Sequence, residues 1–431
     1  MEAGKDDEEA RRTAEAVARR SYGKLVAFLA ARTRDVAAAE DALSEAFASA
    51  LVDWPRRGCP QNPEAWLVTV ARRKIIDSAR RRITGDRAAG ELQFLAEGLD
   101  VGDAAAAAEI PDQRLALMFV CAHPAIEAGV RAPLMLQVVL GLDAKLIASS
   151  FLVSPSTIAK RLVRAKEKIR RAGIPFRVPA RDELSGRLDT VLDAIYATFS
   201  EGWADPRATD VVRRGFSEEA LFLARLLSEL LPDEPEVLGL LALILHALAR
   251  RRARRRGDGD FVPLAEQDQG QWDWPMIAEA EGLLRRASAS VSPGRYQLEA
   301  ALQSAHVYRC RTGENNWAAV VGLYDMLAAL SPSPVVAINR ALAISELLGA
   351  AAGLEAMPEI RSHERLADYQ PYWAARAELL SRTGALLEAG AAYEIAIGLE
   401  RDLAVQRFLR LKQAALSQGP ARTASATLGQ P

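Results

Sequence analysis

Basic side chains gather in two short stretches of this 431-residue chain, and the chemistry available to them is the binding of phosphates. The first stretch, VARRKIIDSARRR, holds six bases within eleven residues: Arg72, Arg73, Lys74, Arg80, Arg81 and Arg82. The second, VSPSTIAKRLVRAKEKIRRAG, sets its bases against a single acid, Glu167; they include Lys160, Arg161, Arg164, Lys168 and Arg171. Clusters of this kind neutralise the phosphates of a nucleic acid.

The formal net charge of −1 conceals an uneven distribution along the chain. Residues 1–182 carry 29 Lys and Arg against 24 Asp and Glu, a balance of +5, whereas residues 183–431 carry 26 against 32, a balance of −6. Residues 86–112 hold seven acids and one base, so the rest of the N-terminal part has 28 bases against 17 acids, or +11. Such a surface fits a polyanionic partner.

The second basic stretch has the pattern of a capped amphipathic helix. Ile158, Leu162, Ala165 and Ile169 recur at steps of four, three and four, which predicts one buried stripe. Ser154 is a suitable N-cap, and Pro155 then stands at the first helical position, where its missing N–H costs nothing.

The residues just before this helix predict a helix-turn-helix. Asp143 can cap a short helix with Leu146, Ile147 and Phe151 on its apolar side, and a turn at 152–153 follows. In such a unit the start of the second helix enters the major groove of DNA. The expected readers are Thr157, Lys160, Arg161 and Arg164, with Ser154 and Ser156 near phosphates. The alternative is an ordinary solvated basic face.

The elements that position these residues predict an all-α protein. We expect a helical domain at 8–85, an acidic linker at 86–112, a helix-turn-helix domain at 113–172 and a helical C-terminal extension at 183–431. In the first domain Asp35 caps a helix with the stripe Ala39, Leu43, Phe47 and Leu51, and a second helix contains Trp66, Val70 and Ile75.

The extension reads as short antiparallel helices, with two matches to the tetratricopeptide (TPR) hairpin pattern. These are Trp373, Ala389, Tyr393 and Ala396, and Val320, Tyr324, Leu327 and Pro332. A stack of such hairpins offers a concave binding surface. Asn339 and Arg340, polar residues in an apolar helix, either bond a neighbouring hairpin or line that surface. Tyr296 and Gln297 likewise either bond a neighbouring hairpin or line the concave surface.

Other signals predict no site. The arginines between Arg250 and Arg256 close an apolar helix, and we expect them to form a solvated helix end. Cys121 and His123 have no second ligand pair at zinc spacing, so we expect no metal and no cofactor. No catalytic triad, phosphate loop or dinucleotide fingerprint is present, which argues against an enzyme. Three scattered cysteines, no membrane-length apolar run and a charged N-terminus predict a cytoplasmic protein.

Taken in order, these segments resemble a known family. The chain is similar to extracytoplasmic-function sigma factors of bacterial RNA polymerase in four successive segments. These are DVAAAEDALSEAFASAL, NPEAWLVTVARRKIIDSARRR, the acidic linker and GLDAKLIASSFLVSPSTIAKRLVRAKEKI. The segments RAGIPFRVP, GRYQLEAA and SPSPVVAINRA resemble the subgroup that carries a long TPR-like C-terminal extension. One departure is Lys145, where the family usually has Glu.

The resemblance implies roles for particular residues. Asp41 and Glu45 would contact the clamp helices of core RNA polymerase. Asn62 would help to capture a flipped base of the −10 promoter element, and the bases Arg72, Arg73, Lys74, Arg80 and Arg81 would hold the adjacent strands. The helix from Pro155 would read the −35 element. Because the extension is acidic and is joined by a short tether, we also expect it to regulate these domains and to bind a protein or ligand partner.

Two alternatives remain. One is a helix-turn-helix regulator that never enters polymerase, and the other is a helical-repeat scaffold. The acidic linker and the Asp41 helix disfavour the first. The capped helix-turn-helix pattern disfavours the second.

Overall fold

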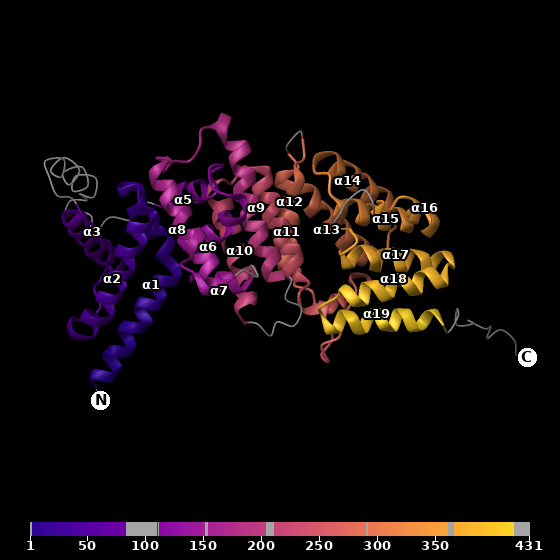
Figure 1. The fold of residues 1–431 in the computed structure, drawn as a ribbon, viewed down its shortest axis with the longest axis horizontal. Coiled ribbons are helices and arrows are strands. Elements are labelled where there is room, and N and C mark those ends of the chain that lie inside the picture. Colours follow the sequence, from indigo (N-terminus) through magenta and orange to yellow (C-terminus); the bar gives the residue numbers. More distant parts are fainter. Residues whose placement is uncertain are drawn as a thin grey trace, which may run out of the picture. The chain divides into compact units, whose positions relative to one another are not determined.

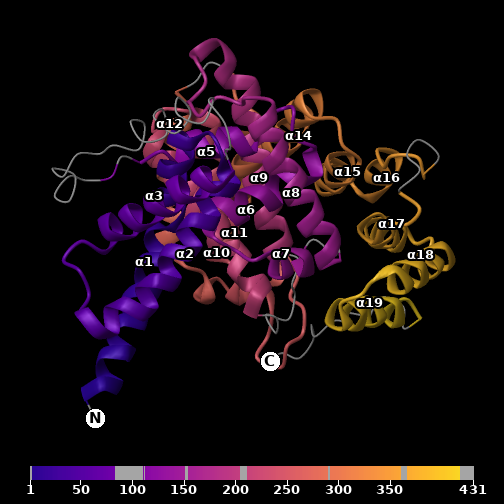
Figure 2. The same ribbon diagram turned by 60° about the vertical axis from the view of Figure 1, so that its left-hand side comes forward.

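The computed structural model describes residues 2–82, 110, 112–150, 154–203, 211–289, 292–360 and 366–417. Within these ranges the chain forms helices and turns, with no strand, which confirms the predicted all-α class. The chain divides into two compact units, residues 1–230 and 231–431 (Figures 1 and 2). None of the described helices is long and apolar enough to cross a lipid bilayer.

The first unit begins with three long helices, which lie where we predicted the first domain. The helices of this unit are α1 (Glu2–Thr33), α2 (Val36–Arg57), α3 (Pro63–Arg82), α5 (Arg114–Cys121), α6 (Ala128–Leu140), α7 (Ala144–Ser150), α8 (Pro155–Arg171), α9 (Arg181–Trp203) and α10 (Val211–Leu230). Most of the predicted linker, 86–109 and residue 111, lies outside the described residues.

Helix α2 begins as predicted and continues to Arg57, beyond the predicted stripe. The backbone N–H of Ala38 donates to the Asp35 carboxylate over 3.0 Å, which is the expected cap. The predicted stripe is wrong at its end, because Leu51 is exposed. The buried stripe runs instead through Ala46, Ala50 and Trp54. Steps of four residues rotate around a helix of 3.6 residues per turn, so a pattern of fours drifts off the buried face.

Helices α1 and α6 approach each other closely. A Cβ atom on Gly23 would lie 2.0 Å from the carbonyl oxygen of Val139, so only glycine fits at this crossing. Nearby, Gly141 ends α6 with a φ of 74° beneath the ring of Tyr22. The two predicted DNA-binding domains are therefore packed together in this unit.

Helices α9 and α10 belong to the first unit, although we expected an extension from residue 183. Helix α9 packs on α5 and α6, and the Arg187 guanidinium donates to the carbonyl oxygen of Phe119 over 3.2 Å. The predicted domain limits stay predictions, but the compact N-terminal body of the structure ends at Leu230.

The second unit continues the chain as helices packed in succession. They are α11 (Pro235–Ala249), α12 (Trp274–Ala287), α13 (Arg295–Thr312), α14 (Trp317–Leu330), α15 (Pro334–Leu348), α16 (Ala350–Glu355), α17 (Gln370–Thr383), α18 (Leu386–Leu399) and α19 (Leu403–Leu416), with short 3₁₀ turns between α11 and α12. Helix α11 is almost wholly apolar because α12 and α13 both pack on it.

The arginines after α11 correct one expectation. Helix α11 ends at Ala249, before these arginines, and Arg250 is buried, with only 6% of its surface exposed. Its guanidinium donates to the carbonyl oxygen of His246 over 3.0 Å and bonds the amide oxygen of Gln303. Arg255, five residues on, pairs with the buried Asp402, the N-cap of α19. These arginines therefore form hydrogen bonds and ion pairs within the second unit.

Helices α17 and α18 form the hairpin predicted from the TPR spacing. Ala389, Tyr393 and Ala396 are buried in one cluster with Ala377 and Leu380, and Trp373 packs against it. The resemblance to TPR repeats beyond this hairpin stays a prediction.

Candidate nucleic-acid interface

Helix α8 has the predicted cap and stripe. The N–H of Thr157 donates to Oγ of Ser154 over 3.2 Å, and Pro155 occupies the first turn. The predicted stripe, Ile158, Leu162, Ala165 and Ile169, is buried. The only acid of the helix, Glu167, is engaged by Arg170 and Arg171, whose hydrogen bonds lower its pKa to about 2.

The predicted DNA-reading side chains lie on the outer face of α8. Lys160, Arg164, Ser154 and Ser156 are exposed, and Thr157 and Arg161 are half-buried. Helix α7 precedes α8, and the N–H of Leu146 donates to Asp143 over 2.8 Å, as predicted for its cap. The predicted turn at 152–153 and the predicted apolar residue Phe151 lie outside the described residues, so the helix-turn-helix stays a prediction.

The second basic surface is the C-terminal half of α3. Arg73 and Arg80 are exposed, whereas Arg72 and Lys74 are half-buried, and Ile75 and Ala79 face the core. Of Arg81 and Arg82 only the helical backbone is described. The basic ends of α3 and α8 thus belong to one compact unit.

The residues predicted to meet polymerase lie on the exposed side of α2. Asp41 and Glu45 are both exposed, one turn apart. Glu45 lies 3.2 Å from Nζ of Lys74 on α3, so a predicted polymerase contact and a predicted DNA contact form an ion pair. A hollow of about 380 Å³ beside this pair is lined by Ser49, Val52 and Asp53 as well.

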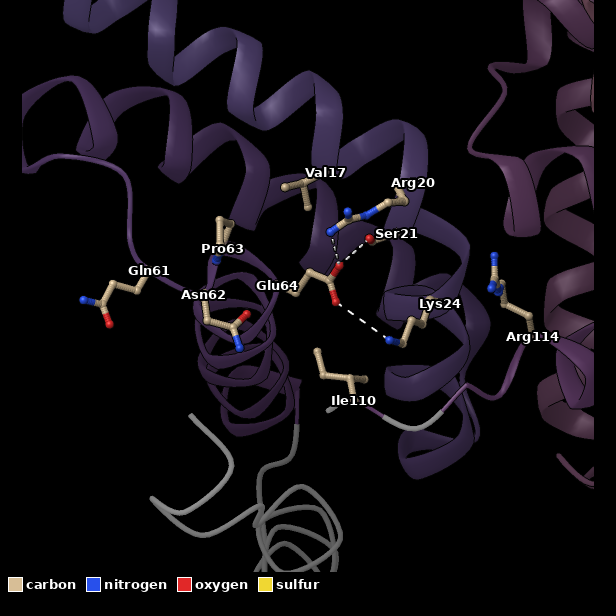
Figure 3. A pocket seen from close by; sticks show the side chains of 10 residues that line it. All are labelled: Val17, Arg20, Ser21, Lys24, Gln61, Asn62, Pro63, Glu64, Ile110 and Arg114. Atoms are coloured by element: carbon tan, nitrogen blue, oxygen red, sulfur yellow. Dashed lines mark hydrogen bonds and ion pairs between the residues drawn. The ribbon is translucent and has the colours of Figure 1, made fainter. Parts of the chain in front are cut away.

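Asn62 is the N-cap of α3 and lines a hollow of about 530 Å³ (Figure 3). Its amide oxygen accepts the N–H of Ala65 over 3.1 Å, which orients the side chain. Gln61 lies beside it on the same loop, and α1 forms the facing wall. Asn62, the residue predicted to capture a base, therefore lies at the edge of this hollow.

Glu64 is the central acid of this hollow. Its carboxylate accepts a 2.5 Å hydrogen bond from Ser21 and lies 3.5 Å from Arg20 and 3.9 Å from Lys24 (Figure 3). Arg114 lines the other side and pairs with Asp112 at 2.6 Å. Our sequence reasoning missed Arg20, Lys24 and Arg114, because they are far from Asn62 in the sequence and belong to no local cluster of bases.

An ion pair between α2 and α8 was also missed. Nζ of Lys166 lies 2.6 Å from Oε2 of Glu40. Burial raises the pKa of Glu40 more than Lys166 lowers it. Cys121 is buried nearby, and burial together with Glu40 raises the pKa of its thiol. No cluster of His, Cys, Asp and Glu suited to a metal occurs among the described residues.

The four residues predicted as a ligand face lie in different settings. Tyr296 and Gln297 are buried, and their backbone N–H groups donate to the Glu236 carboxylate over 3.0 Å each, so α11 caps α13. Asn339 is exposed, and Arg340 pairs with Asp325 at 2.5 Å. Gln297 lines a hollow of about 620 Å³ that residues of α12, α13 and α14 also line. Ligand binding by these residues stays a prediction.

Comparison with known proteins gives two family matches. The model of sigma-70 region 2 matches residues 17–83, and that of a family of unknown function, DUF6596, matches residues 187–288. An uncharacterized protein of Rhizobium meliloti (strain 1021) is 37% identical over 395 residues, which make up 91% of this chain and 93% of that protein. No solved structure gives a significant match.

Proposed function

This chain belongs to one family with the Rhizobium meliloti protein and has a sigma-70 region 2 at its N-terminus, and from this premise we propose that it is an alternative sigma factor. It would bind core RNA polymerase, recognise the −10 and −35 elements of a small set of promoters and start transcription there. One observation carries the proposal: the region 2 match, 17–83, contains Asp41, Glu45, the Asn62 loop and the bases of α3.

The hollow at Asn62 supports a role in promoter opening. Extruding a base from a duplex costs a few kcal/mol, so an opened strand needs a place that receives the base. The amide of Asn62 and the side chain of Gln61 can hydrogen-bond a base edge. Arg20, whose side chain is 83% exposed beside the same hollow, would attract an adjoining phosphate.

The exposed face of α8 supports recognition of the −35 element. Arg161 and Arg164 are one turn apart on a helix with a fixed N-cap. Arginine recognises guanine by two parallel hydrogen bonds in the major groove. Thr157 and Lys160 would contribute further base or phosphate contacts.

The C-terminal region would regulate these domains, as a fused domain acts at high effective concentration, ~mM for a short tether. A test of this regulatory role by truncation depends on where the chain is cut. A chain ending at Arg171 would lose α9 and expose the surfaces of α5 and α6 that it covers. A chain ending at Leu230 keeps the first unit whole. If residues 1–230 and the full chain give equal transcription in vitro and in cells, the regulatory role is excluded.

The decisive experiment for the proposal is transcription in vitro with purified core polymerase and genomic fragments. We expect transcription from specific start sites when the full-length protein is added to core polymerase, and none from those sites with core polymerase alone. Asp41→Lys with Glu45→Lys should abolish co-purification with core polymerase, because both carboxylates would become cations. Unaltered co-purification would contradict the polymerase contact. Promoter binding without any polymerase association would favour the helix-turn-helix regulator instead.

A further inference from the structure

A groove runs between α12 and α13 in the second unit. Both helices pack along α11 but touch each other over a much shorter stretch. The groove consists of two hollows, of about 270 Å³ and about 620 Å³, which share Glu281, Arg285, Ser304 and Tyr308 as lining residues. The shared residues make the two hollows neighbouring parts of one groove.

The larger hollow is mostly apolar, although Gln297 and Asn316 also line it, and small residues form its floor. Ala301, Ser304 and Ala305 of α13 leave space that longer side chains would fill. Leu284 of α12 forms one wall. Leu323 and Met326 of α14 form the other, and Met326 remains 45% exposed. This hollow can remove an apolar molecule from water, which stabilises binding in proportion to the area buried.

The smaller hollow adds charge. Arg285 of α12 and Arg311 of α13 both line it, both are exposed, and neither forms an ion pair within the described parts of the chain. Glu281 lies in the same hollow, with its carboxylate 3.4 Å from Nε2 of the wholly buried His246. The hydroxyl of Tyr308 is bound to Glu314. Two guanidinium groups thus stand at the end of an apolar trough.

We propose that this groove binds a small amphiphilic carboxylic acid. Its apolar body would lie in the larger hollow and its carboxylate between Arg285 and Arg311, where charge-assisted hydrogen bonds are available. The volume favours a small molecule over a peptide helix. About 620 Å³ is typical of small-molecule sites. A helix of roughly 10 Å diameter and 20 Å length would need more than twice that space.

Under the proposed function this acid would be the effector of the C-terminal region, but its binding does not depend on that function. Binding is measured with the full chain alone, without polymerase or DNA. A failure here would leave promoter recognition untouched, and a failure of transcription would leave the binding site untouched.

The test compares decanoate, decanol and decyltrimethylammonium by titration calorimetry below their micelle-forming concentrations. We expect one saturable site for decanoate, with an affinity about tenfold above that for decanol and weaker binding still for the cation. Equal affinities for decanoate and decanol, or no saturable binding of decanoate, would overturn the proposal.

Three variants locate the site. Arg285→Gln with Arg311→Gln should remove the preference for decanoate over decanol while leaving decanol binding unchanged. Ser304→Trp should block both ligands by filling the trough. Arg401→Gln with Arg410→Gln is the matched control, because it removes two exposed arginines of the same unit outside the groove. If the control loses the preference as well, or if Ser304→Trp binds decanoate normally, the site lies elsewhere. Circular dichroism confirms that each variant is folded.

Discussion

Glu40 of α2 and Lys166 of α8 form an ion pair that joins the helix predicted to meet polymerase to the helix predicted to read the −35 element. Their side chains keep 9% and 13% of their exposure, and the two charged atoms are 2.6 Å apart. The −10 and −35 elements are about 25 base pairs apart, or roughly 85 Å of B-form DNA. Under the proposed function α8 must therefore leave α2 when both elements are bound.

The separation of these helices can be measured by energy transfer between dyes at two exposed positions, Ser44 of α2 and Lys168 of α8. We expect high transfer in the free protein and loss of most of it in the complex with polymerase and promoter DNA. High transfer in a transcribing complex would show that the closed arrangement reads promoters, contrary to our expectation.

Removing Lys166 should destabilise the first unit. Lys166→Met leaves the Glu40 carboxylate buried without its partner, and breaking a buried pair in this way costs about 3–5 kcal/mol. Replacing both residues, Glu40→Leu with Lys166→Met, should restore most of the free energy of unfolding. Urea unfolding measures this, and Lys168→Met on the exposed face is the control. A single variant as stable as the unaltered protein would mean that the pair is solvated.

Sequence preference at the −35 element should depend on α8. Arg161→Ala and Arg164→Ala should each cost about 1–3 kcal/mol of discrimination if the side chain binds a guanine by two hydrogen bonds. Binding to matched and mismatched −35 sequences measures it. Arg170→Ala, whose side chain is engaged by Glu167 at the far end of the helix, should leave the preference intact. Equal losses in all three variants would point to phosphate contacts alone.

Gly23 should tolerate no side chain. In Gly23→Ala the new Cβ would lie 2.0 Å from the carbonyl oxygen of Val139, so α1 and α6 must move apart, at a cost of about 1–3 kcal/mol. Gly129→Ala on α6 is the matched control, since nothing lies within 4 Å of its added Cβ. Thermal unfolding of the two variants gives the comparison. Similar melting temperatures would show that the helices adjust at no cost.

The second unit should lose stability in mild acid. Burial and Arg250 lower the pKa of His246 to about 4, and burial, Arg250 and Arg309 lower that of His306 to about 3. Both rings are neutral in the folded protein at pH 5, whereas the unfolded rings bind protons below about 6.5. The free energy of unfolding should therefore fall between pH 6.5 and pH 4 by about 1.4 kcal/mol per pH unit for each ring.

Urea unfolding at pH 7.5 and pH 5.0 measures this dependence. His246→Leu with His306→Gln removes both titrating rings and should flatten it. An unchanged slope in the double variant would assign the acid sensitivity to other groups.

Local patterns predicted the helices better than they predicted contacts between them. The cap at Ser154 and the stripe from Ile158 to Ile169 are set by neighbours within a few residues, so the sequence contains all that determines them. Leu51 was assigned to the wrong face because successive steps of four residues rotate away from the buried face of α2, which runs through Ala46, Ala50 and Trp54. Glu40 and Lys166 are ordinary surface residues by sequence, and only the packing of α2 on α8 pairs them.

The same reasoning explains the arginines after α11. A run of like charges predicts a solvated surface, since nothing in the local sequence shows a partner. The partner of Arg255 is Asp402, 147 positions away at the N-cap of α19. The hollow at Asn62 likewise depends on α1 and on Arg114, which the loop sequence cannot indicate.

The pair of Arg255 and Asp402 changes how the second unit can come apart. In an open stack of helical repeats each repeat touches only its neighbours, so the end repeats fray first and unfolding spreads inward. Here Arg255, in the loop after α11, binds the N-cap residue of α19 through this pair, and Phe261 packs edge-on against Phe408 with ring centres 5.6 Å apart. The last helix is thus fastened to the start of the unit. Loss of the contact between Arg255 and Asp402 would release the start and the end of the second unit together. The second unit should therefore unfold in one cooperative step instead of unfolding first at its C-terminal end.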